Sequence, residues 1–323
     1  MERLLARGLK MNHLRLAAAL SREEKLSDAA LRLGLAQPAA SRLASEIHQI
    51  LGTPLFERHG RGIKLTEAGR AFAARAQRIL NEIDDADREV SEIASGVHGT
   101  VRIGSVTGPA IEMVIPAVRT ARELSEGIRV DVEVATSNQL GPMVRNGALD
   151  FALGRLPADE LSRNLTYCSL AKEPVSFIVG KDHPLAKIEG KVENADLFEW
   201  KWILPPQNSI LARTIDGAFR DMGLPQPDRL VSTSSALMSL AFAGETDSIA
   251  AVARPVAEHF AARGQVHILR TRFSISVEEF GIITRADAQL PPAAQMICDL
   301  VKRHKTKKWA GQEKRANAMR MAL

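Results

Sequence analysis

The sequence is poor in cysteine, in aromatic residues and in long apolar runs. It has two cysteines, one tyrosine and 4% aromatic residues among 323 residues. Two cysteines cannot build a disulfide framework, which favours a reducing compartment such as the cytoplasm. The absence of any run of about 18 uncharged apolar residues argues against a membrane span, and we expect no secretory signal. So few aromatic rings also argue against a surface that stacks the bases of single strands or RNA.

Motifs of common catalytic and metal sites are missing as well. The sequence contains no Gly-x-Ser-x-Gly elbow and no His-Glu-x-x-His pair, and its eight histidines show no metal-ligand spacing. Gly60-x-Gly62 does not follow a strand of a βαβ unit, so it is not a phosphate loop. We therefore expect neither an enzyme nor a resident metal or cofactor.

The charges that are present are unevenly distributed. The net charge is +5, with balances of +5 over residues 1–66, −7 over 67–301 and +7 over 302–323. A basic head on an acidic body predicts that the head binds a polyanion, although a solvated basic surface gives the same balance. A chain of this length is also expected to fold as two or three units.

Three short helices are expected in the head. Residues 13–20 form the first, and Ser27 is expected to cap the second, which ends at Gly34. The third begins near Pro38, whose missing N–H costs little in a first turn. The small residue Ala30 stands where two helices would have to cross. This spacing predicts a helix-turn-helix.

The predicted helix-turn-helix covers residues 26–45. Its second helix directs Ala40, Leu43 and Ile47 inward and presents its N-terminal end to the major groove. Gln can read adenine, and Arg can read guanine or bind phosphate. The candidate DNA-contacting residues of this motif are Ser27, Ala36, Gln37, Pro38, Ala39, Ser41, Arg42 and Ser45.

A β-hairpin is predicted directly after these helices. Residues 59–62 form its turn, and Ile63 and Leu65 alternate with polar residues in the returning strand. The hairpin would complete a winged helix-turn-helix domain over residues 8–66. Taken singly, its basic side chains are as compatible with a solvated surface as with DNA. The residues placed for phosphate or minor-groove contact are Arg58, Arg61, Lys64 and Thr66.

A long linker helix is predicted over residues 67–95. This stretch has no proline, and its apolar residues recur at alternating steps of four and three. Such a heptad seam is typical of a coiled coil, here with a second copy of the chain. An amphipathic helix packed on its own chain is the alternative. The seam consists of Phe72, Ala76, Ile79, Ile83, Ala86, Val90 and Ile93.

Predicted strands and helices alternate through residues 100–303. The alternation predicts right-handed crossovers and a parallel sheet, with residues 129–135 as a half-buried strand. We expect two lobes, one from residues 100–157 and 275–303 and the other from 158–274. The fold class is thus α plus α/β, ending in a basic tail over residues 304–323.

Ligands of open parallel sheets bind beyond the carboxyl ends of the strands, where helix N-termini point. Several predicted strand ends carry hydroxyls, and each of these is equally a natural helix cap. Arg155 lies at the lobe crossing, where it pairs either an anionic effector or a neighbouring carboxylate. Trp200 and Trp202 are expected in the core rather than against a sugar. The candidate effector-binding residues are Ser105, Val106, Thr107, Thr136, Ser137, Asn138, Arg155, Gln207, Ser209, Thr233, Ser234 and Ser235.

The stretch from Ser27 to Arg70 resembles the N-terminal domain of LysR-type transcriptional regulators. Ala36 departs from the family pattern, which often has Ser or Thr there as a cap. The resemblance implies a periplasmic-binding-protein-like effector domain, a homodimer assembled into a tetramer, and pseudo-palindromic promoter DNA and RNA polymerase as partners. The matching residues are Ala29-Ala30, Gln37-Pro38-Ala39, Ser41-Arg42, Leu51-Gly52, Leu55-Phe56-Glu57-Arg58, Leu65-Thr66 and Ala68-Gly69.

Within that family, segments of the body resemble the branch around the galactose-binding-protein regulator. They are DFALGRLPAD, EPVSFIVGKDHPLA, WKWILPP, GLPQP and EEFGIITR. The branch implies a sugar or sugar-like effector. An aromatic acid or another anionic metabolite is the alternative. A thiol-based redox sensor is a third, but Cys168 and Cys298 lie in different predicted segments, and buried inert thiols are commoner.

Overall fold

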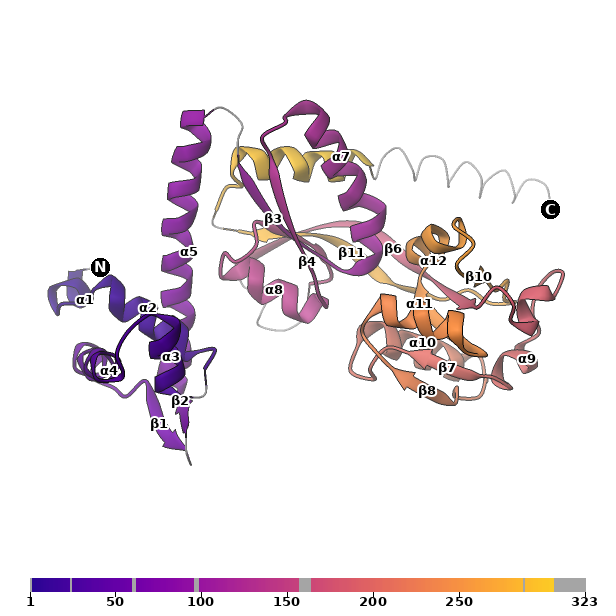
Figure 1. Cartoon of the computed structure of the whole chain (residues 1–323), viewed down its shortest axis with the longest axis horizontal. Helices are drawn as coiled ribbons and strands as arrows, with labels where there is room; N and C mark the ends of the chain where they lie inside the picture. The colour runs from indigo at the N-terminus through magenta and orange to yellow at the C-terminus, as the bar shows by residue number, and fades with distance from the viewer. Residues whose placement is uncertain are drawn as a thin grey trace. The chain divides into compact units, whose positions relative to one another are not determined.

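The computed structural model describes residues 2–23, 25–59, 62–95, 99–156, 164–286 and 288–304. Its internal contacts divide the chain into two compact units, one of residues 1–96 and 146–148 and the other of 97–145 and 149–323. Figure 1 shows the helices of the first unit and the long sheet of the second. Among the described residues, no helix combines the length and the apolar character needed to cross a bilayer.

The first unit consists of short helices, a hairpin and one long helix. Gly34 and Gly52 have φ angles of 66° and 71°, so both take the left-handed conformation expected where a helix ends. A short helix before the expected ones was not anticipated. The elements are α1 (Glu2–Ala6), α2 (Met11–Leu20), α3 (Leu26–Arg32), α4 (Gln37–Leu51), β1 (Phe56–His59), β2 (Gly62–Leu65) and α5 (Glu67–Ser95).

Alanines allow the helices of this unit to approach closely. Ala30 is 2% exposed and Ala40 is fully buried, and both belong to a core that includes Leu16 and Ile47. One expectation is wrong here: α3 begins at Leu26 with Lys25 as its N-cap. Leu26 packs against the core and joins the helix. Ser27 therefore lies inside the first turn, where its hydroxyl donates to Asp28 Oδ1 at 3.1 Å.

The second unit contains a mixed sheet rather than the parallel sheet expected. The strand order is β4-β3-β5-β11-β6-β9-β7-β8, with β10 paired to β6. β3 pairs in parallel with β4 and β5, and β7 with β8 and β9, whereas β11 and β6 run antiparallel to their neighbours. The strands are β3 (Thr100–Ser105), β4 (Arg129–Val134), β5 (Phe151–Gly154), β6 (Leu165–Val179), β7 (Lys201–Leu204), β8 (Arg229–Ser232), β9 (Ser248–Ala253), β10 (His267–Ile268) and β11 (Ser276–Arg285).

Helices connect and cover these strands. The first begins at Thr107 and passes through a π-helical turn. The last spans residues 292–304. α9 and α12 were not anticipated. Besides the last helix, the helical elements of this unit are α6 (Thr107–Pro109), η1 (Ala110–Val114), α7 (Ile115–Leu124), α8 (Ser137–Arg145), η3 (Pro184–Lys187), α9 (Asn194–Phe198), α10 (Ile210–Asp221), α11 (Ala236–Glu245) and α12 (Arg254–Ala261).

Hydrophobic residues form separate cores at the two ends of this sheet. The first core packs β3, β5 and the helix over 292–304, and the second packs β7, β9 and α10. β6 contributes Leu170 to the first core and Phe177 to the second, so one long strand joins them. β4 was expected to be half-buried, but Val132 and Val134 are 46% and 53% exposed because β4 is an edge strand.

Candidate DNA-binding and effector-binding sites

The recognition helix α4 leaves its candidate contact residues accessible. Its apolar face turns inward through Ala40, Ala44, Ile47 and Ile50. Ala36 is the N-cap but supplies no side-chain hydrogen bond, so the backbone N–H groups of the first turn have no hydroxyl cap. Ala39 is half-buried, and the exposed residues are Ala36, Gln37, Pro38, Ser41, Arg42 and Ser45.

A buried histidine fixes α4 against α2. His13 is 1% exposed, its Nδ1 accepts from the Lys10 backbone N–H at 3.0 Å, and its Nε2 lies 2.9 Å from Glu46 Oε2. Since Nδ1 accepts, the proton belongs on Nε2, which donates to the carboxylate. This hydrogen bond lowers the pKa of Glu46. Sequence analysis missed this pair because nothing local links residues 33 positions apart.

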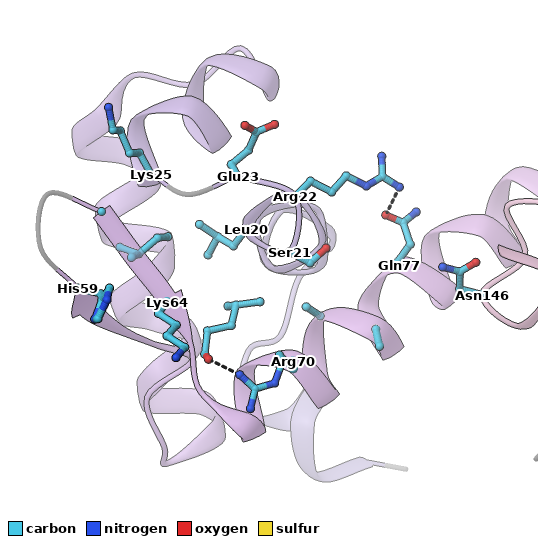
Figure 2. A pocket seen from close by; sticks show the side chains of 15 residues that line it. Leu20, Ser21, Arg22, Glu23, Lys25, His59, Lys64, Arg70, Gln77 and Asn146 are labelled. Carbon is cyan, nitrogen blue, oxygen red and sulfur yellow. Dashed lines mark hydrogen bonds between the residues drawn. The ribbon is translucent and has the colours of Figure 1, made fainter. Parts of the chain in front are cut away.

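The wing is present as the antiparallel pair β1–β2, in register from Phe56 opposite Leu65 to His59 opposite Gly62. Lys64 is exposed. Arg61 and the side chain of Arg58 lie outside the described residues. Figure 2 shows Arg70 anchoring the wing, where its Nη1 donates to the Leu65 carbonyl at 2.7 Å.

The hydroxyl of Thr66 is occupied within the chain. It donates to the Pro54 carbonyl at 2.8 Å and accepts from the Gly69 N–H at 2.9 Å, which caps the start of α5. In the single chain this hydroxyl helps to hold the turn into α5, and a contact of Thr66 with DNA stays a prediction. Gly69 also approaches Leu55 closely, since an added Cβ would lie 1.8 Å from the Leu55 carbonyl oxygen.

The seam of α5 divides into two parts. Phe72 and Ala76 pack into the core of the N-terminal unit. These two residues thus contact their own chain rather than a second copy. The later seam residues are accessible: Ile79 is 45%, Ile83 46%, Val90 67% and Ile93 71% exposed, and Ala86 is exposed as well.

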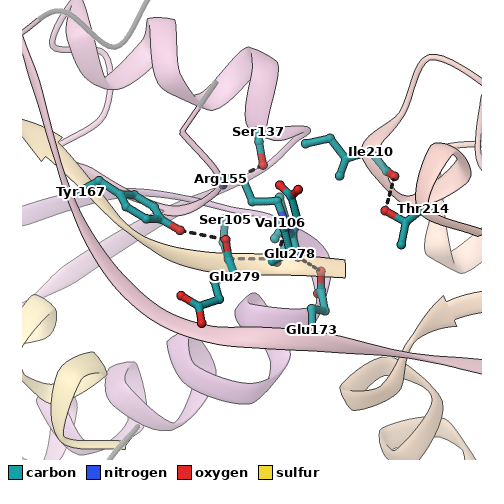
Figure 3. A network of polar contacts seen from close by, with 10 residues as sticks. All are labelled: Ser105, Val106, Ser137, Arg155, Tyr167, Glu173, Ile210, Thr214, Glu278 and Glu279. Atoms are coloured by element: carbon teal, nitrogen blue, oxygen red, sulfur yellow. Dashed lines mark hydrogen bonds and ion pairs between the residues drawn. The ribbon is translucent and has the colours of Figure 1, made fainter. Parts of the chain in front are cut away.

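Three of the predicted effector residues gather at the carboxyl ends of β3, β4 and β5. Ser105 is fully buried and donates to the Val106 carbonyl at 2.8 Å. Ser137 is 4% exposed and accepts from the Arg155 backbone N–H at 2.9 Å. The sequence expected these strand ends to lie together, and Figure 3 shows their side chains in one network.

Arg155 pairs with a neighbouring carboxylate, which is one of the two partners that the sequence left open. Its Nη2 lies 2.9 Å from Glu173 Oε2 on β6, and its Nε donates to the Glu278 carbonyl on β11 at 2.9 Å. Arg155 and Glu173 are both 8% exposed. Burial raises the pKa of Glu173, and the guanidinium opposes that rise. Glu173 was not among the candidates from the sequence, because residues 165–174 lack the apolar alternation that would identify a strand.

Glu173 also faces α6. A Cβ on Gly108 would lie 2.1 Å from Glu173 Oε1 and 3.0 Å from the Ala253 side chain. The absence of a side chain at Gly108 thus leaves room for the carboxylate. Thr107 and Val106 are half-buried beside it, whereas Thr136 and Asn138 are exposed. Thr136 donates to Gln139 Oε1 at 2.8 Å.

Two of the five candidates around β7 and β8 cap helices. Ser209 accepts from Ala212 N at 3.1 Å, and Ser235 accepts from Met238 N at 3.3 Å. Thr233 accepts from Ser235 N at 3.1 Å. Gln207 and Ser234 are exposed. In the described part of the chain, no group of three His, Cys, Asp or Glu side chains could hold a metal ion, and Trp202 is fully buried in the second core.

Comparisons with known proteins match both parts of the chain. Residues 11–70 match a model of the bacterial regulatory helix-turn-helix proteins of the lysR family, and residues 94–306 match the LysR substrate binding domain. The regulator GbpR of Azospirillum brasilense is 36% identical over 287 residues, which cover 89% of this chain and 84% of that protein. GbpR of Rhizobium radiobacter is 35% identical over 286 residues, 88% of this chain and 93% of that one.

Solved structures share the fold. The LysR family regulator CbnR superposes with a TM-score of 0.66 at 20% identity, over 92% of this chain and 99% of that one. CbnR bound to its target DNA gives a TM-score of 0.65 at 22% identity, over 92% and 100%. The helix-turn-helix, the mixed-sheet body and the matched family models lead to one conclusion: this chain belongs to the LysR family of transcriptional regulators.

Proposed function

We propose that this regulator binds promoter DNA through α4 and the wing, and that a neutral, hydroxyl-rich small molecule of the sugar class controls it. The effector would bind between two lobes, made of residues 100–157 with 275–303 and of 158–274. The observation that carries the effector class is the buried pair of Arg155 and Glu173. The regulator acts by binding alone, without a catalytic step.

The buried ion pair disfavours an anionic effector. The guanidinium of Arg155 already has a carboxylate partner, and an incoming carboxylate would have to compete with Glu173 in a poorly hydrated place. Hydroxyl groups face no such cost, because they donate to carboxylates and accept from N–H groups. Ser105, Ser137 and Thr107 add short polar groups and backbone N–H groups around the pair.

The relatives support this class in part. The two GbpR proteins belong by name to the branch that the sequence of the body resembles. One neighbour favours the alternative: the effector domain of QuiR, at 17% identity and a TM-score of 0.53, is in complex with shikimate. Shikimate is a hydroxylated carboxylic acid, so an acid effector is the competing hypothesis.

We further propose that α5 forms the dimer. Ile79, Ile83, Ala86, Val90 and Ile93 repeat at heptad spacing and are exposed in the single chain, as a face awaiting a second helix would be. A two-fold dimer places two recognition helices on a pseudo-palindromic operator. We also propose that two such dimers form a tetramer, and that the tetramer acts on RNA polymerase in the cytoplasm.

The effector class is tested by thermal denaturation of the full chain with three groups of compounds: neutral monosaccharides, sugar acids and aromatic acids. A ligand at a hundred times its Kd adds about 2.7 kcal/mol to the free energy of unfolding. We expect a rise in Tm with a neutral sugar and none with the acids. A rise with acids alone would overturn the proposal.

A variant sharpens this test. Glu173→Gln removes the negative charge while leaving an amide oxygen that can accept from Arg155. The uncompensated guanidinium should then bind carboxylates better. The ratio of the Kd for acids to the Kd for neutral sugars should therefore fall at least about tenfold, or 1.4 kcal/mol. Glu189→Gln, the same chemical change at an exposed position outside the candidate residues, is the matched control. An unchanged preference in Glu173→Gln would show that the pair does not set the effector class.

A further inference from the structure

The two cysteines of the chain, distant in sequence, line the same cavity. Cys168 lies on β6 and is exposed, and Cys298 lies on the helix over 292–304 and is 1% exposed. The cavity has a volume of about 470 Å³ and is also lined by Thr166, Gln295 and Lys302. Neither Arg155 nor Glu173 lines it, although Tyr167, which does, also belongs to the network drawn in Figure 3.

The secondary structure aims both thiols at this cavity. Thr166 and Cys168 alternate along β6 and so share one face of the strand. Gln295, Cys298 and Lys302 follow one another at helical spacing of three and four, so they share one face of the last helix. Both faces line the cavity. Cys168 and Cys298 therefore approach it from opposite elements.

The two thiols differ in chemical character. Burial raises the pKa of Cys298 to about 11, although the Lys302 ammonium lowers it in part. Cys298 is thus a protonated, protected thiol at neutral pH, whereas solvent reaches Cys168 directly. Cys168 is therefore the thiol that an oxidant in solution can reach, and Cys298 is the thiol that can react with oxidised Cys168.

We propose that Cys168 and Cys298 form a reversible disulfide when the protein meets a hydroperoxide. The Cys168 thiolate attacks the peroxide, its O–O bond breaks, and Cys168 becomes a sulfenic acid while water or an alcohol leaves. The Cys298 sulfur then attacks Cys168 Sγ. The S–O bond breaks, and the departing hydroxide takes the Cys298 proton to form water. Two thiols lose two electrons, and one peroxide gains them.

The disulfide would join two elements of the first core. β6 continues from this cavity into the second core, and the last helix packs on the first. A covalent link between them makes the start of β6 an oxidant-sensitive part of the effector domain. The inference does not depend on the sugar effector, because the cavity is a different one.

The experiment is peptide mapping of the full chain after treatment with one equivalent of hydrogen peroxide. Trypsin releases Cys168 in residues 164–172 and Cys298 in residues 286–302. We expect these two peptides joined under non-reducing conditions, the loss of two titratable thiols per chain, and full recovery with dithiothreitol. Cys168→Ser should slow the oxidation of Cys298 by at least about tenfold, because Cys298 is buried and shielded from peroxide in solution.

A shifted cysteine provides the matched control. Combining Cys168→Ser with Ser169→Cys moves the thiol by one residue and hence to the other face of β6, so the joined peptides should disappear. Three results would overturn the proposal: an intermolecular disulfide of Cys168 with Cys298 still reduced, over-oxidation of Cys168 without a disulfide, or two thiols that remain unreacted. The wild-type mapping decides the matter even if a variant fails to fold.

Discussion

The recognition helix and the effector-domain strand ends use their polar side chains in opposite ways. On α4, Gln37, Ser41 and Arg42 are exposed and have apolar neighbours that hold the helix in place. At the strand ends, Ser137, Arg155, Ser209 and Ser235 are already bonded to backbone or to Glu173. The proposed DNA-binding surface leaves its polar groups exposed, whereas the proposed effector site is built from groups that also hold the fold. Substitutions should therefore separate binding from stability in the first region and combine them in the second.

The largest effect on stability is expected at Arg155. Arg155→Ala leaves the carboxylate of Glu173 buried and unpaired, which should lower the free energy of unfolding by about 3–5 kcal/mol. Urea denaturation of the full chain measures this value. Lys201→Ala removes an ion pair whose side chains are 57% and 64% exposed, and should change it by less than about 1 kcal/mol. Equal losses of unfolding free energy in both variants would show that the buried and the exposed ion pair contribute alike to stability.

A charge in the exposed seam of α5 should act on assembly. Ile83→Asp places two carboxylates against each other in the proposed dimer, and we expect dissociation to become at least about a hundredfold easier, or 2.8 kcal/mol. Analytical ultracentrifugation over a range of concentrations gives the dissociation constant. Ala74→Asp, exposed but off the seam, is the control. Dimers that persist unchanged with Ile83→Asp would locate the dimer elsewhere.

Arg42 should affect DNA binding without affecting stability. Arg42→Ala is expected to cost about 1–3 kcal/mol on the specific operator and much less on random DNA if the guanidinium reads a base. Lys64→Ala on the wing should instead weaken all sequences alike and reduce the salt dependence by about one counterion. Fluorescence anisotropy at several salt concentrations distinguishes the two. A constant ratio of specific to random affinity would assign Arg42 to phosphate contact.

The smallest effects separate helix caps from free hydroxyls. Ser209→Ala removes the cap of α10 and should cost about 1 kcal/mol of unfolding free energy. Ser234→Ala changes an exposed hydroxyl and should stay within about 0.5 kcal/mol. Effector affinity then shows which of the two also serves the ligand. A loss of affinity with Ser234→Ala at unchanged stability would place a ligand contact at a residue that does not support the fold.

Local patterns predicted the N-terminal unit well. Gly34 and Gly52 end helices as expected, and the repeat over residues 67–95 forms one helix, because each of these features depends on residues within a few positions. The predicted N-cap of α3 was wrong because Leu26 packs against the core and joins the helix. Residue preferences at helix caps do not take such tertiary packing into account. Phe72 and Ala76 fit the heptad pattern and yet pack on their own chain, since a pattern shows an apolar face but not its partner.

The body exposes the limits of local patterns. The strand β6 is fifteen residues long, and its first ten residues lack the apolar alternation that would identify a strand. Without this strand, neither Glu173 nor the cavity shared by Cys168 and Cys298 could be placed. Both depend on strand pairing between residues more than a hundred positions apart, as in the register of Cys168 with Ile282. The antiparallel return of β11 likewise follows from tertiary topology rather than from the order of elements.

Gly108 limits how this receptor can be redesigned. Any residue with a Cβ at that position would meet a carboxylate oxygen that Arg155 holds in place, so the backbone, the acid and the guanidinium must change together. Efforts to retarget the regulator to another inducer would therefore do better to begin at the exposed positions Thr136 and Gln207, where new side chains meet solvent instead of a charge.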